Sequence, residues 1–351
     1  MEGIKKSFYN YTLSELKKEF SNIGLKSFIA EQVFEWIYKK YVDSFTEMKN
    51  ISKENIKIIS EHFSIEKMEI VDVLEDETTK KFLFKLYDGN IIEMANILFE
   101  FGYSGCASTQ IGCNMGCKFC ASGLTKKKRN LEVGEIVQQI LISNKELIKK
   151  NLKQLKSTSF MGIGEPFDNY DNLVKAIKII NDPKGINLSM RSFTLSTCGL
   201  VNKIIAVATD LPQCNLAISL HATNDNLRTK LMPINKAYKI ADLIAAAKKY
   251  ISITNNDVTF QYTLIRDVND YEEDAKELVK LLDPIKKNCH VTVIEFNQVE
   301  EFDFKSSKNT SVFVDYLKRN RISATQRLKR GNKIAAACGT MRINYTKKTK
   351  T

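Results

Sequence analysis

The stretch GCNMGCKFCASG at residues 112–123 places three cysteines in one short, glycine-flanked loop. The thiols belong to Cys113, Cys117 and Cys120, in the spacing Cys-x3-Cys-x2-Cys. Three thiolates can hold three irons of a four-iron cluster, and the fourth iron is then open to a ligand from outside the chain. A zinc site is the alternative, although zinc prefers four protein ligands and pairs of Cys-x2-Cys. The loop therefore predicts a metal-dependent protein.

After residue 120, strand-like and helix-like segments alternate. The strand-like segments are 157–161, 192–196, 216–220, 258–264 and 291–296, and the helix-like ones are 133–150, 171–181, 201–208, 240–250, 272–282 and 312–318. This alternation implies parallel strands joined by right-handed crossovers. About six such units, fewer than the eight of a closed barrel, predict an α/β fold with an incomplete (βα)6 barrel. In such a barrel, chemistry gathers at the carboxyl ends of the strands.

The chain before the cysteine loop reads as two smaller units. Residues 1–65 are helical in pattern, with a capping box at Thr12 and Glu15 and a stop signal at Gly24. Residues 66–104 alternate with a period of two and turn at Asp88-Gly89, which predicts a short antiparallel β extension. We therefore expect an accessory domain at 1–65, the extension at 66–104, the barrel at 105–345 and a tail at 346–351.

The charge balance points to a polyanionic partner. The 53 Lys and Arg against 41 Asp and Glu give a net charge of +12, which is unusual for an enzyme of small-molecule metabolism. We expect the helical accessory domain to contact nucleic acid, with a solvated lysine-rich surface as the alternative, and the charged run at 124–130 either contacts phosphate or is a solvated loop. The chain lacks an apolar run of 18 residues and a signal-peptide pattern. We therefore expect a cytoplasmic protein that does not enter a membrane.

The spacing of the three cysteines is typical of radical S-adenosylmethionine (SAM) enzymes, in which the open iron binds SAM. Gly164 and Glu165 follow a predicted strand, where the glycine admits the ligand and the carboxylate can accept from its ammonium group. Further polar or ligand-facing positions at successive strand ends are Ser196, Ser219, Leu220, His221 and Asn297. These residues form the predicted SAM site.

Six motifs in order give a more specific resemblance. They are CASTQIGCNMGCKFCASG (106–123), FMGIGEP (160–166), TLSTCG (194–199), ISLHATND (218–225), LMPINKAY (231–238) and AAACG (335–339). This set resembles the RlmN/Cfr family of radical-SAM RNA adenine methyltransferases, from about residue 28 to residue 341. Family members methylate an adenine in the peptidyl-transferase centre of 23S rRNA. The RlmN branch acts at carbon 2, and in many bacteria also on the tRNA adenine beside the anticodon, whereas the Cfr branch acts at carbon 8. The ATND segment and the alanine run favour the RlmN branch.

The resemblance also implies a mechanism that uses two SAM molecules per turnover. Cys338 takes a methyl group from the first SAM, and a radical from the second SAM activates that methyl group for addition to the adenine. Cys106 then attacks the Cys338 sulfur and releases the RNA, while Glu93 accepts the carbon-2 proton. The implied partners are 23S rRNA, tRNA and an electron donor such as flavodoxin or ferredoxin, and we expect a monomer.

Some residues depart from the family pattern, and others are expected to have only a structural role. Around Cys338 the chain has Lys333, Ala335 and Thr340, where most relatives carry acidic residues and a glutamine, and Gln298 replaces part of a proline turn. Residues that we expect to be structural are Cys198, Cys214, Cys289, His62 and His290. Two alternatives remain: a radical-SAM enzyme that uses its radical directly on the substrate, and a zinc-containing RNA-binding assembly factor without catalytic activity.

Overall fold

The computed structural model describes residues 5–297, 302–327, 341–343 and 345 of the chain. Its N-terminal part is helical, as the sequence predicts, with α1 (Leu13–Asn22), α2 (Ser27–Tyr38) and α3 (Lys53–His62). The capping box forms, because the Thr12 hydroxyl accepts from the N–H of Glu15 and the Glu15 carboxylate accepts from the N–H of Thr12. Two short strands, β1 (Lys6–Ser7) and β2 (Phe63–Ser64), pair in parallel and join the two ends of this part.

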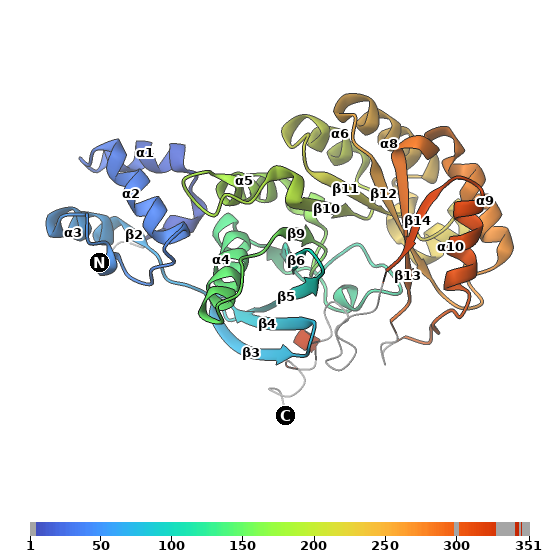
Figure 1. Ribbon diagram of the computed structural model, residues 1–351, viewed down its shortest axis with the longest axis horizontal. Coiled ribbons are helices and arrows are strands. Elements are labelled where there is room, and N and C mark those ends of the chain that lie inside the picture. Colours follow the sequence, from blue (N-terminus) through green and yellow to red (C-terminus); the bar gives the residue numbers. More distant parts are fainter. Residues whose placement is uncertain (1–4, 298–301, 328–340, 344, 346–351) are drawn as a thin grey trace.

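One ten-stranded sheet organises the rest of the chain. Its strands in spatial order are β14 (Ser323–Gln326), β13 (Cys289–Glu295), β12 (Val258–Leu264), β11 (Asn215–Ser219), β10 (Phe193–Thr197), β9 (Ser157–Phe160), β6 (Gly102–Cys106), β5 (Ile91–Phe99), β4 (Thr79–Lys85) and β3 (Glu69–Glu75). Neighbours are parallel from β14 to β6 and antiparallel from β6 to β3. The sheet stays open between its edges β14 and β3, which confirms an incomplete barrel continued by an antiparallel extension (Figure 1).

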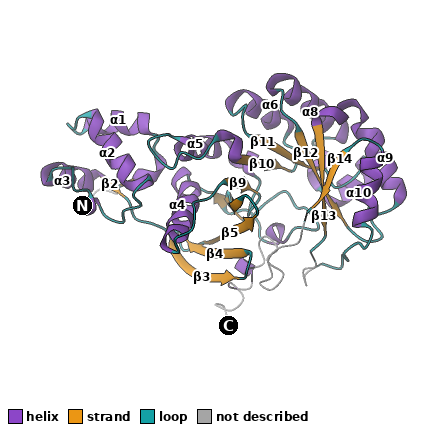
Figure 2. Cartoon of the chain, viewed as in Figure 1, coloured by secondary structure: helices purple, strands orange, loops and turns teal. Residues whose placement is uncertain are grey.

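Helices follow most of the parallel strands. They are α4 (Val133–Lys149), α5 (Tyr170–Asn181), α6 (Val201–Asp210), α7 (Asp225–Leu231), α8 (Ile240–Thr254), α9 (Glu272–Leu282) and α10 (Thr310–Arg319). Figure 2 shows α6, α8, α9 and α10 along one side of the parallel strands. A pair of two-residue strands, β7 (Gln110–Ile111) and β8 (Arg129–Asn130), encloses the cysteine loop. No helix formed by the described residues is apolar over a length that could cross a membrane.

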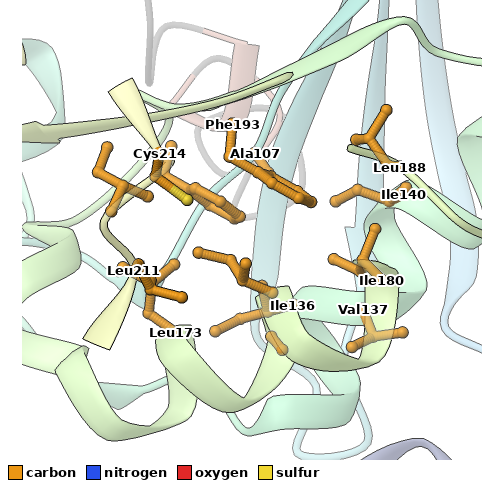
Figure 3. Packing of buried hydrophobic residues seen from close by; sticks show 14 of the residues in the cluster. Ala107, Ile136, Val137, Ile140, Leu173, Ile180, Leu188, Phe193, Leu211 and Cys214 are labelled. Carbon is orange, nitrogen blue, oxygen red and sulfur yellow. The ribbon is translucent and has the colours of Figure 1, made fainter. Parts of the chain in front are cut away.

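The main core lies between the sheet and its covering helices. Figure 3 shows Ile136, Val137 and Ile140 of α4 packed beside Leu173 and Ile180 of α5. Burial of such side chains stabilises each by about 1.5–3 kcal/mol relative to exposure, so this layer fixes the strands against which it packs. The cysteine loop and the strand ends that face it are therefore attached to a rigid frame.

The antiparallel extension shares its hydrogen bonds with the barrel. Strand β6 pairs with β5 through Ala95 and Cys106 on one side, and with β9 through Cys106 and Ser159 on the other. The predicted limit at residue 104 falls inside β6, and the division of the chain into domains stays a prediction.

Candidate active site

The loop between β7 and β8 carries the three cysteines, and its backbone is tightly closed. The Cys113 N–H donates to the carbonyl of Thr125 over 3.0 Å, and Gly112 has a φ of +79°. A Cβ atom at position 112 would lie 2.3 Å from the carbonyl oxygen of Lys126, so only glycine fits there. On the far side of the loop, the Lys118 N–H donates to the Leu231 carbonyl over 2.9 Å. All three thiols are partly exposed.

The donor set fits a four-iron cluster better than a single metal ion. Among the described residues, no three His, Cys, Asp or Glu side chains converge closely enough to bind one metal ion. A cluster needs one thiolate per iron, so its ligands are spread out, whereas zinc needs ligands around one point. Burial raises the pKa of Cys113 to about 11 and that of Cys117 further, so without a cluster these thiols are protonated. Binding of a cluster then displaces their protons.

Gly164 and Glu165 lie beside the loop, after β9. Gly164 has a φ of +108°, and a Cβ atom there would lie 2.6 Å from the Gln110 side chain. The Glu165 carboxylate is buried and accepts from the N–H groups of Phe167, over 3.0 Å, and of Cys198, over 2.8 Å. Burial raises the pKa of Glu165. Both oxygens thus already hold the backbone of two neighbouring turns, a role that the sequence did not predict.

The other predicted SAM residues lie at the carboxyl ends of successive strands. Ser196 is on β10, Ser219 ends β11 and leads to Leu220 and His221, and Asn297 follows β13 on the surface. His221 is buried, and its Nδ1 atom accepts from the Thr263 N–H over 2.9 Å. Burial lowers the pKa of His221 to about 3, so the ring is neutral.

His221 also connects its strand end to the cysteine loop. Its ring meets the edge of Phe119, with 4.8 Å between the ring centroids, and Phe119 lies between Cys117 and Cys120 in sequence. Among the predicted SAM residues, His221 therefore contacts the predicted cluster loop, and the N–H of Glu165 donates to Gln110 of β7 at the edge of that loop.

A second group of buried residues lies on one face of the antiparallel extension. The register pairs Lys81 with Ala95 and Ala95 with Cys106, so these three positions form a row across the sheet. Glu93 is two residues from Ala95 and faces the same side as Cys106, a diagonal separation of roughly 7–8 Å between backbones. The Lys81 ammonium donates to the Glu93 Oε1 atom over 3.3 Å, and both side chains are buried.

Cys338 lies outside the described residues, as do Gln298, Lys333, Ala335 and Thr340. The chain is described again at Met341, which is buried, and at Arg342, whose N–H donates to the Oε2 atom of Glu93 over 3.2 Å. The position four residues after Cys338 is thus attached beside Glu93 and Cys106.

Side chains of the basic run after the cysteines form hydrogen bonds and ion pairs with other residues of the chain. Lys127 donates to Asp168 over 2.7 Å and Lys128 to Asn90 over 2.7 Å. Arg129 binds the carboxylates of Asp88 and Glu135, each over 2.7 Å. These contacts tie the loop to the extension and to α4, whereas Lys126 and Lys128 remain exposed, so the phosphate contact stays a prediction.

The comparisons with known proteins agree with this arrangement. Residues 7–65 match the profile of the ribosomal RNA large subunit methyltransferase N-terminal domain, and residues 108–282 match the radical SAM superfamily. The chain is 51% identical to the dual-specificity RNA methyltransferase RlmN of Malacoplasma penetrans over 344 residues, which cover 97% of each chain. It is 46% identical to the corresponding protein of Spiroplasma citri, over 96% of this chain and 97% of that one. The chain belongs to the RlmN family.

A solved member of the wider group has the same fold. The crystal structure of a radical SAM methyltransferase from Sphaerobacter thermophilus superposes with a TM-score of 0.91 at 35% identity, covering 95% of this chain and 98% of that one. The family resemblance, the enzyme class and the α/β fold expected from the sequence are therefore confirmed. RlmN-family membership implies a four-iron, four-sulfur cluster and SAM, for which Cys113, Cys117 and Cys120 fit the motif.

The sequence did not predict that Lys81 and Arg228 are buried. Lys81 sits in an alternating strand segment, where a lysine normally faces solvent, and its pairing with Glu93 depends on the sheet register. Arg228 follows the ISLHATND motif on α7 and is fully buried. The sequence feature that could have drawn attention to Arg228 is its position between the ISLHATND and LMPINKAY motifs.

Proposed function

We propose that this chain methylates carbon 2 of an adenine in the peptidyl-transferase centre of 23S rRNA, and also the adenine 3′ to the tRNA anticodon. The relatives named dual-specificity RNA methyltransferases support both substrates, and the net charge of +12 suits an RNA partner. The accessory helices at 7–65 match an N-terminal domain of ribosomal RNA methyltransferases, which supports a role in RNA binding.

One observation carries this proposal: Glu93 and Cys106 share a face of the extension, and the chain returns to Glu93 at Arg342, just after Cys338. A nucleobase seated there would meet a base and a thiol together. The bound cluster and two SAM molecules supply a methyl group for Cys338 and a carbon radical that activates it. Cys338 carries the methyl carbon to the adenine, and Glu93 accepts the proton lost from carbon 2. Cys106 forms a disulfide with Cys338 as the sulfur–carbon bond breaks, the proton of its thiol completes the methyl group on the adenine, and the one electron left over would return to the redox centre. A thiol reductant from outside the chain then restores both cysteines.

The SAM-binding roles follow from the strand ends. Gly164 lets the turn after β9 approach Gln110 closely and so shapes one edge of the ligand site. Glu165, Ser196, Ser219, Leu220, His221 and Asn297 provide the surrounding walls and hydrogen bonds. Glu165 also holds the turns at Phe167 and Cys198 in position. The neutral His221 has Nδ1 occupied as an acceptor, so its Nε2–H is available to donate.

The remaining partners follow from the chemistry. The cluster must receive electrons from a small redox protein such as flavodoxin or ferredoxin. The enzyme acts as a monomer in the cytoplasm, the compartment that contains both RNA substrates.

The test is a set of cysteine variants assayed on 23S rRNA fragments and tRNA. Cys338→Ala abolishes methylation and forms no enzyme–RNA adduct, whereas Cys106→Ala accumulates a covalent adduct that survives denaturing electrophoresis. Cys289→Ala is the matched control, because this buried cysteine starts β13 and should leave methylation intact. Methylation by Cys338→Ala would show that the radical acts directly on the substrate.

Mass spectrometry of the product distinguishes the two branches of the family. We expect 2-methyladenosine in both RNAs. Detection of 8-methyladenosine would identify a Cfr-like enzyme, and a colourless, zinc-containing protein after anaerobic purification would favour an assembly factor.

A further inference from the structure

Arg228 is a buried cation whose hydrogen bonds end on neutral oxygens. It lies on α7 with no exposed surface. Its guanidinium donates to five acceptors, the carbonyls of Cys198 (2.7 Å), Ser219 (3.0 Å), Leu220 (3.2 Å) and Tyr238 (3.5 Å) and the Oδ1 atom of Asn235 (3.0 Å). Among the described residues, no ion pair includes Arg228. A guanidinium keeps its charge at any physiological pH, so this position holds a buried positive charge.

Such a charge is costly without a negative partner nearby. Taking a single ion out of water costs several kcal/mol even after the protein relaxes, and neutral carbonyls offset this in part. Asp225 is the carboxylate linked to Arg228, through Asn235: its Oδ1 atom accepts from Asn235 over 2.9 Å. Asp225 is half-buried, so solvent screens its charge.

The cysteine loop lies against the same segment. The Leu231 carbonyl, three residues after Arg228, accepts from the Lys118 N–H, and Gly116 approaches the ring of Pro233. Cys117 packs in a small apolar cluster with Cys198, Leu231 and Met232. The thiols that fit the cluster therefore lie next to the helix that carries the buried charge.

A four-iron cluster held by three thiolates is negative and becomes more negative on reduction, and nearby charge and hydrogen bonding set its potential. We propose that Arg228 is a positioning residue whose buried charge is balanced by the iron–sulfur cluster, so that it raises the reduction potential of the cluster while holding the ends of β10 and β11. Its bonds to Cys198, Ser219 and Leu220 fix the turns that follow the predicted SAM residues Ser196 and Ser219. This inference rests on the assignment of the cluster to Cys113, Cys117 and Cys120.

The test is a potentiometric titration of the reconstituted enzyme, followed by electron paramagnetic resonance without SAM or RNA. Arg228→Gln removes the charge and should reduce the ratio of reduced to oxidised cluster about tenfold at a fixed ambient potential, a shift of about 59 mV. Arg228→Lys keeps the charge but loses most of the bonds, so its potential should stay near that of wild type. Asp225→Asn removes the linked negative charge and should shift the potential upward by much less, because solvent screens Asp225.

Iron analysis separates the possible failures. A wild-type protein without a four-iron signal would overturn the cofactor assignment itself. A loaded Arg228→Gln enzyme with the wild-type potential would overturn the proposal. If Arg228→Gln does not retain iron, Arg228→Lys decides, because a clearly lowered potential in that loaded variant, which keeps the positive charge, would equally overturn the proposal.

The apoprotein gives an independent readout. When the cluster is absent, the charge of Arg228 is unbalanced, so Arg228→Gln should lower the free energy of unfolding less in the apoprotein than in the loaded protein. A purely structural role predicts the same loss in both forms.

Discussion

The N–H of Arg342 donates a hydrogen bond to the Oε2 atom of Glu93 over 3.2 Å, joining positions 249 residues apart in sequence. The other carboxylate oxygen of Glu93 binds the ammonium of Lys81. Glu93 therefore connects the segment that follows Cys338 to the middle of the antiparallel extension. A proton that arrives on Glu93 would weaken both contacts, since each depends on the negative charge of the carboxylate.

Replacing Glu93 should separate catalysis from folding. Glu93→Gln keeps the shape of the side chain and its acceptor for Arg342, but it cannot take up a proton. We expect methylation to fall by at least ~10²-fold, with accumulation of the covalent enzyme–RNA adduct. Single-turnover assays and denaturing electrophoresis measure both effects. A variant with normal iron content and a wild-type rate would exclude Glu93 as the proton acceptor.

The Lys81–Glu93 pair should be coupled in stability. Lys81→Met removes the cation that binds the buried Glu93 carboxylate, so we expect a loss of about 3–5 kcal/mol in the free energy of unfolding. The double variant Lys81→Met/Glu93→Gln should lose clearly less than the sum of the single variants, because the two opposite charges are removed together. Denaturant unfolding of the four proteins measures this coupling. Additive losses would mean that the two charges do not interact.

The cysteine loop should tolerate a methyl group at one glycine and not at another. Gly112→Ala combines a positive φ with a Cβ atom 2.3 Å from a carbonyl oxygen, so the loop must open and iron incorporation should fail. Gly123→Ala is the matched control in the same loop, since its Cβ atom would meet the Cys117 carbonyl at an ordinary 3.6 Å. Iron content after identical reconstitution compares the two. Full iron loading of Gly112→Ala would contradict the geometry of the loop.

His221 should make the apoprotein sensitive to acid. Burial lowers its pKa to about 3, below the usual value near 6.5. Between these two pH values the unfolded chain therefore binds a proton at this ring that the folded chain does not bind. The stability that the neutral ring contributes is complete above about pH 6.5 and is lost as the pH falls toward 3, at about 1.4 kcal/mol per pH unit. His221→Asn retains an acceptor for the Thr263 N–H and suits the positive φ of 58° at this position. Unfolding measured between pH 7 and 4 should depend less on pH in this variant. An unchanged slope would place the acid sensitivity elsewhere.

Periodicity predicted most of the barrel, because its strands and helices are apolar on the faces they bury. The predicted strand 258–264 and helix 272–282 coincide with β12 and α9. Helix α7 was missed because its seven residues, DNLRTKL, carry few apolar positions, and the edge strand β14, SATQ, has too few to reveal a period of two.

The site residues that belong to local motifs were predictable from the sequence. Those that come together only through long-range strand pairing were not. The spacing of Cys113, Cys117 and Cys120 is visible in one line of sequence, whereas the contact of Lys81 with Glu93 depends on a sheet register that no local pattern contains. Cys198 was read as a small core residue, and it is buried as expected. Its backbone also links Glu165 to Arg228, a relationship that only the folded chain reveals.

Strand β6 has partners on both sides, β5 in the extension and β9 in the barrel. In a shortened protein that begins after the extension, one edge of β6 would have unpaired backbone N–H and C=O groups. Strands of other chains can form hydrogen bonds with such an edge. The extension moves the open edge of the sheet from β6 to β3, whose exposed Glu69, Asp72 and Glu75 oppose pairing with other chains. The barrel alone should therefore aggregate more readily than the intact chain.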